Sequence, residues 1–464
     1  MPNSQVAAPK VQPTGLLRQL GFFSATALVI SNMVGMAIFG TTGFMAEQLG
    51  SAGLILACWA VGALFAFAGA LSYSELGVNF PSSGGEYVYL TQAYGPEWGF
   101  MTGWVSFFAG FSAPIAAAAL AFSDYLGYFF PSLKAANASI VIGSGAFTLR
   151  LGAGQAAASA LIAGFTILNC LGVGRTAKVQ NVLTSTKLLV IVGFVLLGFL
   201  SGNGSWTHFS EPAVRTSTLS LPAQFLVSLL WVVVGYSGWN AATYVAEEVR
   251  RPERTLPVAL AAGTAIVAAL YLALNLIFIY ATPLEKMKGE IAIGSISAAN
   301  LFGPHIAGLF SALMAICIVS TVNAEVTVGP RVYFAMAKNR AFFRSAASVH
   351  PRWHTPVVAI LSQGVCAMVL TLTSFPALLY YIGFSLALFT VLSVASIFVF
   401  RRRRPGWQRL RAVDFAYPLI PAAYVIFGAC MMIYGIIWQP VASVTALATV
   451  GVGALVYHFK VRQT

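Results

Sequence analysis

The sequence predicts an all-α membrane protein with twelve transmembrane helices. Of its 464 residues, 58% are hydrophobic and only 8% are charged, and the mean hydropathy is +0.81. These values lie far outside the range of soluble globular proteins. The chain also contains many apolar runs of about 20 residues, the length that an α-helix needs to cross the hydrocarbon core of a bilayer.

Twelve such runs follow one another along the chain. The first is not a cleavable signal peptide, because its apolar stretch is too long and a polar tail of about 20 residues precedes it. The eighth is long because the amphipathic run 331–338 continues it. The predicted spans are 22–47, 53–77, 98–123, 154–173, 180–201, 222–247, 257–281, 304–337, 356–374, 377–400, 416–437 and 441–459.

The distribution of Lys and Arg predicts the orientation of these helices. With the N-terminus inside, the tails and the even-numbered connections hold nineteen of the 26 basic residues and the opposite side holds five, while Lys187 and Arg331 lie within predicted helices. Because cytoplasmic loops are enriched in basic residues, both termini are expected in the cytoplasm. The predicted location is the cytoplasmic (inner) membrane, which the chain crosses many times. The run 401–404 (RRRR) either stops a helix at the membrane surface or binds anionic lipid.

Several classes of function are excluded by composition and motifs. The net charge of +13 is dispersed over short loops, which argues against nucleic acid binding. Catalytic triads, phosphate-binding glycine loops and zinc signatures are absent, and all five cysteines fall inside predicted helices without metal-ligand spacing. We therefore expect neither an enzyme nor a bound cofactor or metal.

The first and sixth predicted helices are each interrupted near the middle by small or flexible residues. The breaks lie within 32–40 (NMVGMAIFG) and 235–240 (GYSGWN), about 200 residues apart. Unwound backbone at that depth of a bilayer occurs only where it lines a cavity or is buried in protein. In transporters built from inverted repeats such breaks hold the substrate, because helix N-termini attract anions and freed carbonyls attract cations.

The chain resembles the amino acid, polyamine and organocation (APC) transporter superfamily over nearly its whole length. The matching stretches, besides 34–39 in the first helix, are SYSELGVNFPSSGGEYVYL, GVGRTAKVQNVLTSTKLL, GYSGWNAATYVAEEVRRPERTLP and VNAEVTVGPRVYFAMAKN. Within the superfamily, the Gly-Trp-Asn of helix 6 and the Lys of helix 5 most resemble the L-type amino acid transporters and their bacterial relatives.

The resemblance implies a LeuT-type fold, in which helices 1 to 5 and helices 6 to 10 form inverted repeats. The expected organisation is an N-terminal tail at 1–21, a first repeat at 22–201, a second repeat at 222–400, two peripheral helices at 416–459 and a C-terminal tail at 460–464. Helices 1, 2, 6 and 7 are expected to rock against helices 3, 4, 8 and 9.

The same resemblance implies that an amino acid zwitterion binds between the two breaks. Relatives usually carry Gly-Ser-Gly-Ile-Phe in helix 1, whereas this chain has Gly-Met-Ala-Ile-Phe, and alanine favours helix over glycine by roughly 1 kcal/mol. The alternative is that these small residues only pack helices together. Expected contacts of the carboxylate are Val34, Gly35, Met36, Ala37 and Ile38, and those of the ammonium are Val234, Gly235, Tyr236, Ser237, Gly238, Trp239 and Asn240.

One position of this site departs from the pattern of the superfamily. Many relatives place a large aromatic residue, which covers the bound substrate as a gate, where this chain has Val234. Either the pocket is wider than usual, or Tyr236 or another aromatic residue is the gate. For Tyr236 and Trp239 individually, ordinary packing is an equal alternative.

Lys187 is the most informative single charge. A lysine within a membrane helix is costly unless it is paired or faces a polar cavity, although snorkelling to the interface is the alternative. It aligns with a lysine that in this superfamily bridges the helix 1 break and helix 8, where sodium-coupled relatives bind sodium. The ammonium would replace that cation permanently or carry a proton. Its expected polar partners are Ser320 and Asn323.

Glu325 is a carboxylate in helix 8 at a point where relatives tend to have an uncharged residue. Three roles remain open: a proton-binding group coupled to transport, a counter-ion for a cationic substrate, or a structural partner of Arg331. Other charges at the cytoplasmic helix ends, namely Glu75, Glu86, Glu247, Glu248, Arg250, Arg254 and Arg331, are expected to form ion-pair networks that close the inner gate.

The resemblance as a whole implies a sodium-independent secondary amino acid transporter working by alternating access, either as an exchanger or as a proton symporter. A polyamine or cationic amine antiporter is the alternative. L-type transporters of animals use a partner glycoprotein joined through a cysteine between helices 3 and 4, but segment 124–152 has none. We therefore expect no disulfide-linked heavy chain, and a monomer or homodimer. The expected partners are an amino acid, membrane lipid and, if the protein is a symporter, a proton.

Overall fold

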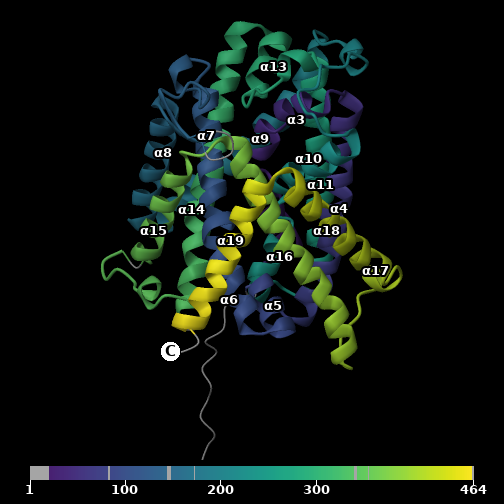
Figure 1. The fold of residues 1–464 in the computed structure, drawn as a ribbon, viewed down its shortest axis with the longest axis vertical. Helices are drawn as coiled ribbons and strands as arrows, with labels where there is room; N and C mark the ends of the chain where they lie inside the picture. The colour runs from purple at the N-terminus through teal and green to yellow at the C-terminus, as the bar shows by residue number, and fades with distance from the viewer. Residues whose placement is uncertain are drawn as a thin grey trace, which may run out of the picture.

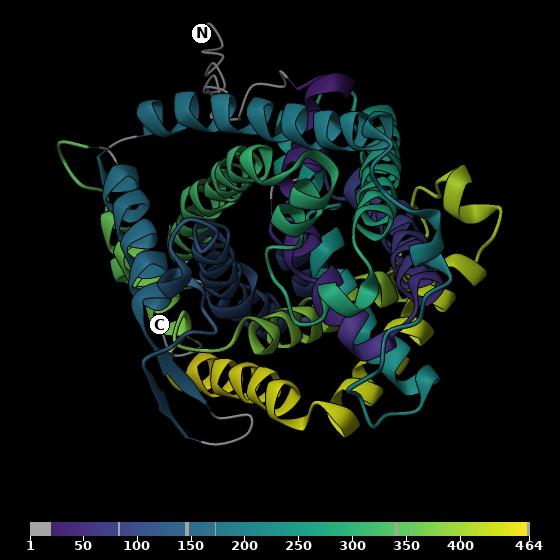
Figure 2. The same ribbon diagram turned by 90° about the horizontal axis from the view of Figure 1, so that it is seen from above.

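The computed structural model describes residues 20–81, 84–143, 148–171, 173–338, 342–353 and 355–461, without the side chains of 173–184, 247, 248, 335 and 338. Long helices form a bundle in which most of them run roughly parallel to the long axis of the molecule (Figure 1). Seen from above, α9 lies across one side of this bundle (Figure 2).

The helices follow in an order that matches the predicted spans. Short turns, loops and one β-hairpin between them account for the rest of the described backbone. In chain order the helical elements are α1 (Phe22–Met33), α2 (Ala37–Gly40), α3 (Thr42–Leu49), α4 (Ala52–Asn79), α5 (Glu86–Tyr94), α6 (Pro96–Val105), η1 (Ser106–Ser112), α7 (Ala113–Leu126), η2 (Pro131–Leu133), α8 (Ala153–Cys170), α9 (Val173–Ser201), η3 (Trp206–Phe209), α10 (Leu221–Tyr236), η4 (Ala241–Glu248), α11 (Pro252–Ala281), α12 (Leu284–Met287), α13 (Ile293–Phe302), α14 (Pro304–Lys338), η5 (Arg344–Ala347), α15 (Val357–Leu370), α16 (Phe375–Arg403), α17 (Arg411–Asp414), α18 (Leu419–Trp438), α19 (Pro440–Val456) and η6 (Tyr457–Val461).

Ten of the described helices are long and apolar enough to cross a membrane. The remaining two predicted spans correspond to α9, whose apolar part is Ser185–Ser201, and to α15, whose 14 residues extend only about 21 Å. The chain is therefore a mostly helical, multi-pass membrane protein. Helix α9 begins seven residues before the predicted start, because its polar first turns are helical although they are not apolar.

A small antiparallel β-hairpin was not anticipated by the all-α prediction. Strand β1 (Ile140–Ile142) pairs with β2 (Leu149–Leu151), with Val141 opposite Arg150. The hairpin lies between α7 and α8 in the chain, and the backbone N–H of Arg150 donates to the carbonyl of Leu372 at 2.8 Å. It is therefore attached to the connection between α15 and α16.

The broken helices lie among helices that pack closely through small residues. Helix α11 packs against α4 and α1, α10 packs against α4 and α16, and α7 packs against α14. The run of alanines at 116–119 in α7 is fully buried. Small side chains let helix backbones approach one another in a membrane protein. These contacts surround the two breaks with rigid helices.

Candidate functional site

The helix 1 break occurs where the sequence predicts it. Helix α1 ends at Met33, and α2 begins at Ala37 after three non-helical residues. The N–H of Val34 still donates to Ile30, and that of Phe39 donates to Met36. The N–H of Gly35 faces the Tyr271 hydroxyl, whereas no hydrogen bond from the N–H of Met36 to another backbone group is present among the described residues. The start of α2 thus offers backbone donors to a ligand.

The helix 6 break also occurs at the predicted segment. Helix α10 ends at Tyr236, and Ser237 leaves the helical region with φ −56° and ψ 146°. Gly238 has φ +96°, and a Cβ atom there would lie 2.8 Å from the carbonyl oxygen of Asn32 near the end of α1. The two breaks therefore lie directly against each other, and the close approach requires glycine.

Two side chains occupy the carbonyls at the end of α1. The Tyr271 hydroxyl donates to the Met33 carbonyl at 2.6 Å, and the Lys187 ammonium donates to the Val34 carbonyl. Lys187 is buried, with 1% of its surface exposed, so it does not snorkel to the interface. A cation at the negative end of a half-helix stabilises that break. The structure thus brings Lys187 to the helix 1 break, and the predicted partners Ser320 and Asn323 are buried in α14.

Glu325 lies near Lys187 without pairing with it directly. The two charges interact through space, but no direct ion pair joins them. The guanidinium of Arg331 donates to the Thr327 carbonyl, and no ion pair joins it to Glu325. The structural pairing of Glu325 with Arg331 is therefore not present in this state.

The aromatic residues of helix 6 pack against neighbouring helices. The Tyr236 hydroxyl donates to the Trp59 carbonyl at 3.2 Å, and its ring meets those of Trp59 and Tyr271. Trp239 meets Tyr73 edge to face, with ring centres 4.7 Å apart. These contacts favour packing over gating for both residues. Val234 is itself buried.

A different aromatic group lies one turn earlier in helix 6 than Val234. Trp231 contacts Phe44 of α3 and Tyr380 of α16, and Phe44 stacks on Phe375. The indole N–H of Trp231 is buried and has no hydrogen-bond acceptor among the described residues. This aromatic cluster (Phe44, Trp231, Phe375 and Tyr380) closes the end of the site that carries α3 and α10. Trp231 is thus the aromatic residue of helix 6 that lies one turn before Val234, and a gating role for it stays a hypothesis.

Backbone contacts close the same end. The N–H of Gly289 donates to the Gly43 carbonyl at 3.2 Å, just after α12. A Cβ atom at Gly43 would lie 2.1 Å from the carbonyl oxygen of Glu290. Helix α3 and the α12 region therefore meet without space for a side chain. In Figure 1 this end of the bundle is the one with α3 and α13.

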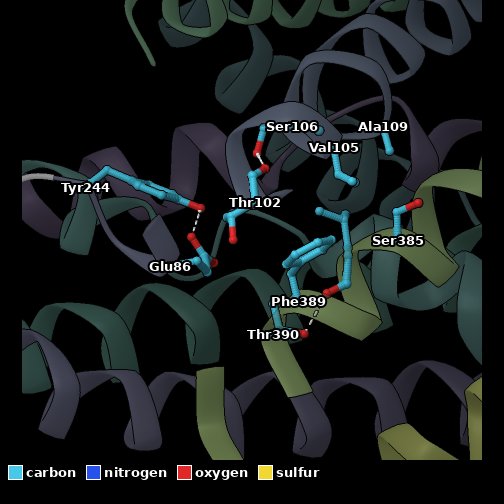
Figure 3. Close-up of a pocket in the computed structure, with 11 residues that line it drawn as sticks. Glu86, Thr102, Val105, Ser106, Ala109, Tyr244, Ser385, Phe389 and Thr390 are labelled. Atoms are coloured by element: carbon cyan, nitrogen blue, oxygen red, sulfur yellow. Dashed lines mark hydrogen bonds between the residues drawn. The ribbon is translucent and has the colours of Figure 1, made fainter. Parts of the chain in front are cut away.

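A polar cavity of about 40 Å³ lies toward the other end, between α5, α6, η1, η4 and α16. Its size corresponds to about three water molecules. The turn η1 that borders it is a π-helix, a widened turn that often occurs at functional sites. Figure 3 shows the carboxylate of Glu86 at one side of this cavity and Phe389 at the other. Its lining residues are Glu86, Thr102, Val105, Ser106, Ala109, Gly110, Tyr244, Ser385, Leu386, Phe389 and Thr390.

Glu86 joins α5 to the second half of helix 6. Its Oε2 accepts from the Tyr244 hydroxyl at 2.5 Å, and its Oε1 accepts from Asn240 at 2.5 Å and from the Tyr73 hydroxyl at 3.0 Å (Figure 3 shows the first bond). Burial raises the pKa of the Glu86 carboxyl, although the hydrogen bonds from Tyr244, Tyr73 and Asn240 lower it. We refer to these four residues as the Glu86 latch.

The predicted ion-pair network at these helix ends is wrong for Glu86. No Lys or Arg of the described residues forms an ion pair with Glu86, whose partners are neutral donors. Glu75 pairs with Arg401 at 2.7 Å, which joins α4 to α16 rather than to helix 6. The side chains of Glu247 and Glu248 lie outside the described residues.

Comparison with known proteins assigns the chain to a family. The sequence pattern of the amino acid permease family matches residues 20–454. The chain belongs to the amino acid permease family. It is accordingly a member of the APC superfamily, as the motifs of helices 1, 5, 6 and 8 indicate.

Three curated relatives show how far the similarity of this permease extends. It is 29% identical over 454 residues to the mouse large neutral amino acids transporter small subunit 2, covering 96% of this chain and 81% of that protein. It is 29% identical over 415 residues to the serine/threonine exchanger SteT of Bacillus subtilis, covering 88% and 89%. It is 27% identical over 457 residues to the mouse Asc-type amino acid transporter 1, covering 96% and 82%.

Sequence reasoning missed three elements of the permease site. Tyr271, Trp231 and the tyrosine partners of Glu86 all make contacts between distant parts of the chain. A weak signal existed for Tyr271, because it shares α11 with Asn275, which accepts a hydrogen bond from Thr42 at 2.8 Å. Two polar side chains one turn apart in an apolar helix indicate a polar neighbour.

Proposed function

We propose that this permease is a sodium-independent secondary amino acid transporter that works by alternating access. The observation that carries the proposal is the contact between the two helix breaks, with Gly238 against Asn32 and the Met36 N–H without a backbone acceptor among the described residues. The substrate carboxylate binds the N–H groups of 35–37, and its ammonium binds carbonyls of 234–237. This arrangement needs no charged side chain to hold a zwitterion.

Sodium independence rests on Lys187. Its ammonium already occupies the carbonyl end of α1 through Val34, so a fixed positive charge stands where a bound cation would otherwise stabilise the break. Twelve spans arranged as a LeuT-type inverted repeat, with both termini in the cytoplasm, are the architecture that we propose for this mechanism. In the arrangement described here the end with α3 is closed, which corresponds to a state closed toward the outside.

Uptake into proteoliposomes tests the proposal. Labelled alanine, leucine, serine, arginine and putrescine are offered with and without sodium, a pH gradient and internal amino acid. We expect uptake of a neutral amino acid that is unchanged by sodium and is accelerated either by internal amino acid or by an inward proton gradient. The proposal would be contradicted if uptake required sodium, or if none of these amino acids were taken up.

A cationic amine antiporter is the second candidate function. It is favoured by Glu325, a membrane-embedded carboxylate without an ion-pair partner among the described residues, and by the small side chain at Val234. Putrescine uptake that exceeds leucine uptake in the same assay would support it. This candidate is weakened because Glu325 is a single acid, whereas a diamine has two charges to neutralise.

Glu325→Gln is expected to abolish accumulation driven by a pH gradient while exchange at equal pH continues. The glutamine keeps the size of the side chain but cannot bind and release a proton, and it removes the charge that interacts with Lys187. Uptake is measured with and without a gradient in the same vesicles. An unchanged response to the gradient would assign Glu325 a structural role.

The Glu86 latch is expected to make exchange slower at low pH. The latch is closed when Glu86 accepts these hydrogen bonds, and it opens when they break. Because the Glu86 carboxyl has a raised pKa in the closed latch, proton binding stabilises the closed latch and slows its opening. This stabilisation is complete below the ordinary value of 4.5 and is lost as the pH rises through the raised value. We therefore expect the exchange rate at equal pH on both sides to fall as the pH is lowered from 7 toward about 4.5.

Glu86→Gln imitates the protonated carboxyl, so its exchange should be slow at every pH in this range. The matched control is Glu97→Gln, which replaces an exposed acid in α6. We expect the control to keep the pH profile of the unmodified protein. The same profile in Glu86→Gln would mean that Glu86 does not set the pH dependence.

A further inference from the structure

The four arginines at the end of α16 divide into two pairs. Arg401 is held by the protein, since it pairs with Glu75 at 2.7 Å and with Asp414 at 2.8 Å and lies over the ring of Tyr417. Arg404 donates to Gln92 at 2.9 Å and lies over the ring of Phe80. Arg404 is the C-cap of α16 and is exposed, but its guanidinium, like that of Arg401, contacts other parts of the protein.

Within the described part of the chain, Arg402 and Arg403 have no such contacts. Both are exposed, and neither has a hydrogen-bond or ion-pair partner among the described residues. Together with Phe398 and Val399, one turn earlier, they line a recess at the surface. The recess thus has two guanidinium groups at one end and two apolar side chains at the other.

Segment 411–419, which contacts the end of α16 through Asp414 and Tyr417, has the same two-part character. Arg411 begins α17 and is exposed, whereas Phe415 and Leu419 are 82% and 70% exposed. The nearby acids cannot neutralise the patch, because Glu75 and Asp414 are both engaged by Arg401. A surface that is strongly basic beside largely exposed apolar side chains is typical of the boundary between headgroups and acyl chains of a bilayer.

We propose that this recess binds one anionic phospholipid. The phosphate accepts hydrogen bonds from the guanidinium groups of Arg402 and Arg403, and an acyl chain lies along Phe398 and Val399. Guanidinium groups suit this role because their N–H donors match the geometry of phosphate oxygens. The lipid would hold the end of α16 against the membrane, and α16 is one wall of the polar cavity at Glu86.

Native mass spectrometry of the purified full-length protein tests the proposal. The protein in detergent is titrated with phosphatidylglycerol or with phosphatidylcholine of the same acyl chains. We expect one phosphatidylglycerol to be retained and phosphatidylcholine to be lost. Replacing both arginines, Arg402→Gln with Arg403→Gln, should weaken binding by about 25-fold, about fivefold for each charge near the surface.

A control variant and a competitor separate this site from general attraction. The double variant Arg344→Gln with Arg352→Gln removes two exposed arginines elsewhere, and it should bind phosphatidylglycerol normally. Excess inorganic phosphate should not displace the lipid, since it has no acyl chain. Equal retention of both lipids, equal weakening in both double variants, or displacement by phosphate would overturn the proposal.

A gel-filtration profile and helical circular dichroism identify any variant that fails to fold. If the double glutamine variant misfolds, Arg402→Lys with Arg403→Lys keeps both charges but loses the paired donors of each guanidinium. That variant should still bind phosphatidylglycerol, but less tightly than the unmodified protein. Undiminished binding would overturn the direct guanidinium contacts that we propose. Because binding is measured without transport, its outcome does not depend on the proposed function.

Discussion

Lys187→Ala is expected to abolish amino acid transport while the protein still inserts and folds. The substitution removes the ammonium that donates to the Val34 carbonyl and leaves that buried carbonyl without a partner. An unsatisfied buried group costs up to about 3 kcal/mol, which corresponds to about a 100-fold loss of the binding-competent arrangement. Uptake of the transported amino acid into proteoliposomes measures the effect, at protein levels matched by immunoblotting.

Two comparison variants show whether this loss is specific. Lys286→Ala removes an exposed lysine of α12 and should transport normally. Tyr271→Phe removes the neighbouring bond to the Met33 carbonyl but no charge, and should reduce uptake by about tenfold. Normal uptake by Lys187→Ala would remove Lys187 from the mechanism.

Gly43→Ala is expected to reduce transport by at least about tenfold, because it prevents the α3 end from closing. The new methyl group would meet the Glu290 backbone carbonyl at 2.1 Å, and neither backbone can yield as a flexible side chain does. Substrate binding, measured with labelled amino acid on the purified protein, should remain. The predicted defect is therefore in the transport cycle rather than in the binding site.

The matched control for this variant is Gly53→Ala in α4. Its new Cβ atom would have only the Ser51 hydroxyl nearby, at 3.9 Å. It makes the same chemical change a short distance along the chain, and we expect normal uptake. Uptake by Gly43→Ala that matches Gly53→Ala would show that close contact between α3 and Glu290 is not needed for the cycle.

Local sequence information was sufficient for the helices and for the two breaks. Apolar runs placed helical segments near every predicted span, because burial in lipid requires their length and composition. The breaks were found because small residues interrupt apolar runs at 35 and 238, and at Gly238 the backbones of helices 1 and 6 approach each other. Of the contacts at the helix 1 break, only that of Lys187 was predicted, because Lys187 aligns with a lysine that has this place in the superfamily.

Contacts between distant segments were beyond this reasoning. Glu86 was predicted to pair with arginine because it lies near helix ends rich in basic residues. In the structure, Asn240 and Tyr244 donate hydrogen bonds to its carboxylate instead. The β-hairpin was missed because each strand has only three residues, too few for an alternating pattern. Trp231 lies one turn away from the position that the superfamily pattern indicated.

An experimental structure with the transported amino acid bound tests the central claim most directly. The account predicts that the carboxylate lies within hydrogen-bond distance of the N–H groups of 35–37 and the ammonium within hydrogen-bond distance of carbonyls of 234–237. An amino acid bound instead beside Glu86 in the polar cavity, or continuous first and sixth helices with no ligand between them, would contradict it.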